Sequence, residues 1–223
     1  MTTSHPLRSR LKAAALELRL TLSDHQETSL LAYLDQLQRW NRTYNLTAIR
    51  DPGQMLTHHL VDSLAIVRPL RENLLGKLDG RVIVDVGSGA GLPGIVLAIM
   101  HPQLTVHCVD TVEKKATFIR QAASVLKLPN LQAHHARIEG LPFFEADVVV
   151  SRAFASLVDF ATLAGCHVAP GGRLLAMKGK NPVEEIEALH AATPWRVQRT
   201  ETLLVPELNA ERCVLWITDQ GRS

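Results

Sequence analysis

The chain has 223 residues, of which 46% are apolar and 21% charged, and its formal net charge at pH 7 is +2. This length allows one large domain or one and a half small ones. The small basic surplus permits an RNA partner without the strong excess of a dedicated nucleic-acid module. No apolar run approaches the roughly 18 residues of a membrane span. The N-terminus lacks a secretory signal pattern, so we expect a cytoplasmic protein without membrane contact.

Three cysteines lie far apart in the sequence, without the short spacings of zinc or redox pairs. We therefore expect free thiols and no bound metal. The adjacent histidines His58 and His59, and His134 and His135, point to different faces of a helix or strand, so neither pair makes a chelate by itself. Nothing in the sequence demands more than a monomer.

Helices are predicted in residues 1–78, where apolar residues recur at helical spacing. Ser23 caps the second helix, and Asp51 with Pro52 begins the third. The apolar stripes are Leu7, Leu11, Ala14 and Leu18 in the first helix, Leu30, Leu34, Leu37, Trp40 and Tyr44 in the second, and Leu56, Leu60, Leu64 and Val67 in the third.

From residue 79 onward strands and helices alternate, which favours a doubly wound α/β domain over residues 79–223, preceded by the helical segment 1–78. The tail differs, because two strands follow each other without a helix, as in a C-terminal antiparallel hairpin. Strands are predicted at 82–86, 104–109, 131–135, 147–151, 173–178, 196–205 and 211–218, and helices at 92–101, 112–127, 157–168 and 182–191, with a turn at Pro170–Gly172.

A glycine-rich turn, GxGxG, follows the first predicted strand. Gly87, Gly89 and Gly91 leave the backbone bare, so a ligand can approach it at a helix N-terminus. Dinucleotide-binding proteins have GxGxxG instead. Asp110 ends the next strand, where a carboxylate can accept hydrogen bonds from both hydroxyls of a ribose. The ligand should carry an adenosine-like ribose, and S-adenosylmethionine fits at least as well as a nicotinamide dinucleotide.

Five runs in order, with matching gaps, resemble the bacterial 16S rRNA guanine-N7 methyltransferases, the RsmG or GidB family. They are Trp40–Ile49, His59–Leu64, Asp85–Gly94, Ser151–Ala155 and Lys178–Gly179, and the resemblance extends from about residue 25 to residue 217. It implies a class I, Rossmann-like methyltransferase sheet, mostly parallel, with S-adenosylmethionine as cofactor. It also implies methylation of a guanine N7 in the 530 loop of 16S rRNA, within the small ribosomal subunit or its precursor.

Carried onto this sequence, the resemblance and the turn together predict the cofactor-binding residues. These are Asp85, Gly87, Gly89, Gly91, Leu92, Asp110, Ile138, Glu139 and Arg152. Asp85 contacts the methionine amino group or caps the turn. Glu139 lies at the adenine edge or is a solvated acid at a helix start, and Asp110 is the ribose acceptor or a surface acid.

Substrate binding is predicted for Asn45, Thr47 and Lys178. Asn45 and Thr47 form the rim of the base pocket or only a turn with side chains bonded to backbone. Arg152 is the predicted catalytic residue through positioning, because it could fix a substrate phosphate, fix the base or reach the cofactor. His59 is predicted to form a hydrogen bond with Asp62.

Guanine N7 presents a lone pair at neutral pH, so no general base is expected. The slot after the fourth strand lacks the Asn/Asp-Pro-Pro-aromatic motif of adenine amine methylation, and it lacks the cysteine of pyrimidine C5 methylation. A nicotinamide oxidoreductase is disfavoured by the turn spacing and the terminal hairpin. A non-catalytic ribosome-assembly factor with a cofactor pocket and a small-molecule methyltransferase remain as alternatives.

Overall fold

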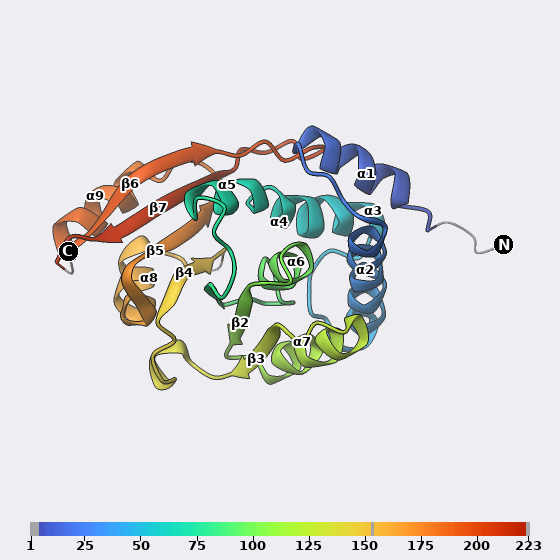
Figure 1. Cartoon of the computed structure of the whole chain (residues 1–223), viewed down its shortest axis with the longest axis horizontal. Coiled ribbons are helices and arrows are strands. Elements are labelled where there is room, and N and C mark those ends of the chain that lie inside the picture. Colours follow the sequence, from blue (N-terminus) through green and yellow to red (C-terminus); the bar gives the residue numbers. More distant parts are fainter. Residues whose placement is uncertain (1–4, 153, 222–223) are drawn as a thin grey trace.

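The computed structural model describes residues 5–152 and 154–221; Ala153, within the run Ser151–Ala155, lies outside them. The strands of these residues form a mixed seven-stranded sheet in the order β3-β2-β1-β4-β5-β7-β6 (Figure 1). β1 to β5 are parallel, and β7 is antiparallel to both of its neighbours. The strands are β1 (Val82–Val86), β2 (Thr105–Asp110), β3 (Leu131–His135), β4 (Ala146–Ser151), β5 (Val168–Lys178), β6 (Trp195–Thr202) and β7 (Cys213–Asp219).

Helices cover both faces of the sheet. The N-terminal helices with α6 and α7 share one apolar cluster, whereas α8 and α9 belong to the cluster on the other face. The helices are α1 (Arg8–Glu17), α2 (Asp24–Tyr44), α3 (Pro52–Met55), the π-helix η1 (Leu56–Val61), α4 (Asp62–Leu64), α5 (Val67–Asn73), α6 (Gly94–Met100), α7 (Glu113–Leu126), the 3₁₀ turn η2 (Ile138–Gly140), α8 (Leu157–Ala164), the 3₁₀ turn η3 (Gly165–His167) and α9 (Val183–Ala192).

The central strand β1 contributes apolar side chains to both faces of the sheet. Ile83 packs into one apolar cluster and its neighbour Val84 into the other, and neither side chain is exposed. Such continuous β-branched runs are typical of parallel strands covered by helices on both faces. Connections leave β1 toward β2 on one side and β4 toward β5 on the other, and ligands bind at the carboxyl ends of strands at such a switch point.

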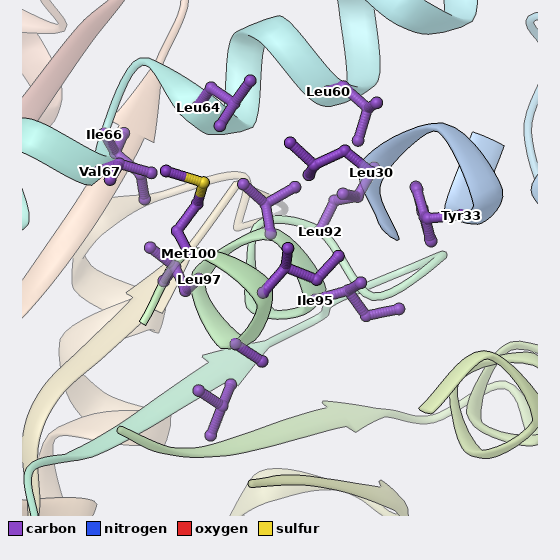
Figure 2. Packing of buried hydrophobic residues seen from close by; sticks show 14 of the residues in the cluster. Leu30, Tyr33, Leu60, Leu64, Ile66, Val67, Leu92, Ile95, Leu97 and Met100 are labelled. Atoms are coloured by element: carbon purple, nitrogen blue, oxygen red, sulfur yellow. The ribbon is translucent and has the colours of Figure 1, made fainter. Parts of the chain in front are cut away.

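Helix α6 joins the N-terminal helices to the sheet. Every residue of α6 is buried, and Figure 2 shows Leu97 and Met100 packed near Leu64, Ile66 and Val67 from the helical segment. One apolar cluster therefore crosses the predicted boundary at residue 78. The division into 1–78 and 79–223 stays a prediction about chain organisation.

The fold class, the parallel order and the C-terminal antiparallel strands confirm the sequence prediction. Two local predictions are wrong. The turn at Pro170–Gly172 lies inside β5, where Gly171 has φ +78° and the register with β4 shifts, so a bulge replaces the turn. The single third helix is broken by the π-helical turn η1, although the residues of its predicted apolar stripe are all buried in one cluster. No helix in the described ranges is long and apolar enough to cross a membrane.

Candidate cofactor and substrate site

The glycine-rich turn links β1 to α6 with backbone that other residues rarely adopt. Gly87, Gly89 and Gly91 have φ values of 69°, 61° and 84°. A Cβ on Gly91 would also lie 2.6 Å from Cδ1 of Ile95. The chain therefore presents bare backbone at the carboxyl end of β1, as predicted for a ligand cradle.

Asp110 fixes this turn to the end of β2. Its Oδ2 accepts the Gly89 N–H at 2.8 Å and its Oδ1 accepts the Val112 N–H at 2.8 Å. Each carboxylate oxygen has a second lone pair, so these bonds leave room for a ribose hydroxyl. Asp110 also lines a cavity, which is the position that the ribose prediction requires.

The first cavity, of about 240 Å³, lies beside the turn and suits the adenosine end of the cofactor. Four of the predicted cofactor residues line it: Gly87, Asp110, Ile138 and Glu139. Apolar side chains complete its wall, and a mostly apolar pocket with few polar groups is what an adenine needs.

A second cavity, of about 550 Å³, adjoins the first because both are lined by Gly87. Besides the shared Gly87, four more predicted residues line it, which are Gly89, Leu92, Arg152 and Lys178; Gly91 and Asp85 line neither cavity. His58, His59, Asp62 and Arg212 line it too, and none of them was predicted as a site residue.

Asp62 joins two arginines in the second cavity. Its Oδ2 accepts a hydrogen bond from Arg152 at 3.0 Å, and its Oδ1 accepts one from Arg212 at 2.9 Å. The Asp62 carboxylate is 6% exposed, whereas the two arginine side chains are about a quarter exposed. The group therefore carries a net charge of +1 and presents guanidinium donors to the cavity.

His59 bonds to a different partner from the one predicted. Its Nε2 lies 3.0 Å from the Thr47 hydroxyl, while Asp62 is occupied by the two arginines, so the expected His59–Asp62 bond is wrong. The π-helical turn between them changes the direction of successive side chains. Burial and the positive charge of Arg152 lower the pKa of His59 to about 4, so the ring is neutral at pH 7.

The residues before η1 form hydrogen bonds with each other and with residues that line the second cavity. Thr47 accepts the Ile49 N–H through its hydroxyl and donates its own N–H to Asn41. Asn45 is an exposed residue with φ 47° at the end of α2, and its side chain accepts from Arg50. Neither residue lines the cavity, so their substrate role stays a prediction.

Lys178 ends β5 and lies in the wall of the second cavity. Its ammonium group donates to the Phe154 carbonyl at 3.1 Å and pairs with Glu185 at 2.8 Å. These contacts hold the lysine at the cavity mouth, and its predicted contact with substrate is not tested by them.

Asp85 is fully buried beneath the turn. Its Oδ2 accepts the Gly94 N–H at 2.8 Å, and its Oδ1 has no partner in the described residues. Burial raises the pKa of this carboxyl to about 7. The contact that caps the turn is present, and the contact of Asp85 with the methionine amino group stays a prediction.

These features fit S-adenosylmethionine. The bare turn, the acid beside it and two adjoining cavities match a nucleoside with a flexible amino-acid arm. By contrast, no group of three potential metal ligands occurs within residues 5–152 and 154–221.

Comparison with known proteins decides the family. The family described as "GidB: rRNA small subunit methyltransferase G" matches residues 26–215. The chain belongs to the GidB family. The assignment confirms the predicted enzyme class, an S-adenosylmethionine-dependent methyltransferase with a Rossmann-like sheet.

Relatives of this GidB protein are similar over nearly their whole length. "Ribosomal RNA small subunit methyltransferase G" of Bordetella avium is 59% identical over 208 residues, covering 93% of this chain and 92% of the relative. The protein of the same name from Albidiferax ferrireducens is 50% identical, covering 95% and 96%.

Solved structures with low identity share the fold. A SAM-dependent methyltransferase from Aquifex aeolicus aligns with a TM-score of 0.54 at 19% identity, covering 75% of this chain and 98% of that one. TrmN from Thermus thermophilus aligns with a TM-score of 0.53 at 18% identity, covering 70% and 48%.

Proposed function

We propose that this GidB protein transfers the methyl group of S-adenosylmethionine to N7 of a guanine in the 530 loop of 16S rRNA. The observation that carries the proposal is the pair of cavities that share Gly87 at the ends of the central strands. One suits the adenosine end of the cofactor, and the other is large enough for a base and lined by arginine donors. The names of the 50–59% identical relatives support the small-subunit rRNA as substrate.

The chemistry asks for positioning more than for proton transfer. S-adenosylmethionine, when bound, supplies a methyl group on a positively charged sulfur. Gly87, Asp110 and Glu139 would hold its adenosine end, with Ile138 beside the adenine. Guanine N7 needs no base to free its lone pair, and the neutral His59 ring adds no positive charge to the second cavity.

Arginine side chains would orient the acceptor. Guanine presents the O6 acceptor beside N7, and guanidinium donors recognise this edge and nearby phosphates. Arg152 and Arg212 are held side by side by Asp62, so their donors converge on one cavity. Asp62 neutralises one of the two charges, which limits repulsion of the cationic cofactor.

RNA loops suit this cavity because their bases can be splayed out at low cost. We propose that the protein acts as a monomer in the cytoplasm, on the small ribosomal subunit or its precursor. The modest net charge of +2 favours RNA presented in a defined shape over attraction by bulk charge.

Labelled methyl transfer to three acceptors tests the function: small subunits lacking this modification, naked 16S rRNA, and a mixture of small metabolites. We expect incorporation into RNA. Cofactor binding without transfer to any acceptor would instead favour the non-catalytic assembly factor, and transfer only to metabolites would favour a small-molecule methyltransferase.

A further inference from the structure

An exposed aromatic ring ends helix α2, five residues before Ile49 in the wall of the second cavity. Tyr44, the last residue of α2, is 46% exposed, although most large apolar and aromatic side chains of this helix are buried. One side of its ring packs on Trp40, with ring centroids 5.0 Å apart. Trp40 packs in turn on the fully buried Phe118 at 5.6 Å. The Tyr44 ring therefore packs against Trp40 on its inner side, while much of its surface is exposed to solvent.

Two cations are held by hydrogen bonds to Tyr44 and its neighbour Asn45. Lys114 donates to the Tyr44 carbonyl at 2.7 Å, and Arg50 donates to the Asn45 side chain at 3.0 Å. Both are exposed, and neither forms an ion pair with a carboxylate in the described part of the chain. Exposed Arg42, in the last turn of the same helix, adds a third positive charge.

The ring and its cations lie on the cavity side of the sheet. Lys114 is in the first turn of α7, directly after the end of β2 where Asp110 lines the first cavity. Ile49, five residues after Tyr44, lines the second cavity. A five-residue link spans at most about 18 Å, so the backbone of Tyr44 lies within that distance of Ile49 in the cavity wall.

We propose that Tyr44, flanked by Arg50 and Lys114, forms a platform on which an unpaired base of the RNA substrate stacks next to the target nucleotide. An open aromatic ring with neighbouring cations is the combination that binds single-stranded nucleic acid, because every base has a π-face and every nucleotide a phosphate. The platform deepens the proposed function and rests on it, since it assigns the RNA segment that flanks the modified guanine. The predicted residue Asn45 acts here by orienting Arg50.

Tyr44→Ala tests the stacking directly. We expect a 5- to 150-fold rise in the Kd for unmodified 16S rRNA, measured by filter binding, since stacking of one base on an aromatic residue contributes that much. KM for small subunits should rise similarly, while the Kd for S-adenosylmethionine stays unchanged. Tyr44→Phe should behave like the native protein. Leu75→Ala, at an 81% exposed residue before β1, is the control for loss of exposed apolar surface.

Lys114→Ala tests the cations, with Lys77→Ala as the matched control before β1 at the opposite end of the sheet. Lys114→Ala should lower the slope of log K against log salt concentration by about 1. Native-like RNA binding by Tyr44→Ala would overturn the platform, and so would an equal loss in Tyr44→Phe. Weaker binding to subunits alone, with naked RNA bound as before, would assign the surface to a protein of the subunit. If the native protein binds RNA but transfers no methyl group, the proposed function fails while the binding data still decide the platform.

Discussion

Removal of the Asp62 charge should affect stability and catalysis together. Asp62→Asn keeps the side-chain size but removes the carboxylate that accepts from Arg152 at 3.0 Å and Arg212 at 2.9 Å. A hydrogen bond to a charged group contributes about 1.5–3 kcal/mol. Because both arginines are about a quarter exposed, water replaces part of each bond, and we expect a loss of about 2–4 kcal/mol in the free energy of unfolding.

Chemical denaturation measures this loss, and Glu72→Gln is the control. Glu72 pairs with Arg68 at 2.6 Å on an exposed helix surface, where an ion pair contributes at most about 0.5 kcal/mol. Methyl transfer supplies the second readout. Loss of orientation of Arg152 and Arg212 should lower kcat at least about 10-fold.

Cofactor affinity distinguishes the loss of the Asp62 charge from a general distortion of the site. The substitution leaves two unneutralised guanidinium groups in the second cavity, so affinity for S-adenosylmethionine, with its sulfonium charge, should fall more than affinity for S-adenosylhomocysteine, which has no net charge. Calorimetry measures both. The reasoning is refuted if Asp62→Asn unfolds and turns over like the native protein, or if both ligands lose affinity equally.

Further substitutions test the glycine-rich turn, the role of Arg152, and the dependence of stability on pH. Asp110→Ala should weaken S-adenosylmethionine binding by about 10-fold or more, because two bonds to a charged group that fix the turn are lost; unchanged affinity by calorimetry would contradict the ribose role. Gly91→Ala should lower the free energy of unfolding by about 1–3 kcal/mol, measured by denaturation, since φ is 84° there. Arg152→Ala should lower kcat about 100-fold, by analogy with loss of one transition-state donor, and should lower the free energy of unfolding by about 1–2 kcal/mol, because one of the two bonds to Asp62 is lost; an unfolded variant would count against a site role. Burial lowers the pKa of His107 to about 4, so the unfolded chain binds the extra proton between pH 6.5 and 4 and stability falls on acidification. His107→Gln should flatten that fall, and an unchanged slope of unfolding free energy against pH would contradict it.

Local patterns were enough to predict the glycine-rich turn and the acid beside it. The turn and the acid that ends β2 are each signalled by a strand and the few residues after it. Because parallel strands bring their carboxyl ends to one edge, correct strands also place these residues together. The family resemblance added Leu92, Ile138, Glu139 and Arg152, and the identity of the RNA.

The substrate half depends on contacts that the local pattern does not contain. Asp62 meets Arg152 across 90 residues of sequence and Arg212 across 150. The π-helical turn that directs Asp62 into the cavity leaves the apolar spacing of an ordinary helix almost unchanged, so periodicity predicted a continuous helix. The run His59–Leu64 was noted for its resemblance, and that was the one signal in the sequence that could have identified Asp62.

The position of the methyl group tests the central proposal most directly. Small subunits lacking the modification would be treated with the protein and S-adenosylmethionine, and the 16S rRNA would be mapped by chemical cleavage at N7-methylguanosine. We predict one new cleavage, in the 530 loop, that appears about 100-fold more slowly when the Arg152→Ala variant is used. Methyl incorporation without cleavage, or cleavage elsewhere in the RNA, would contradict the proposed atom or the proposed site.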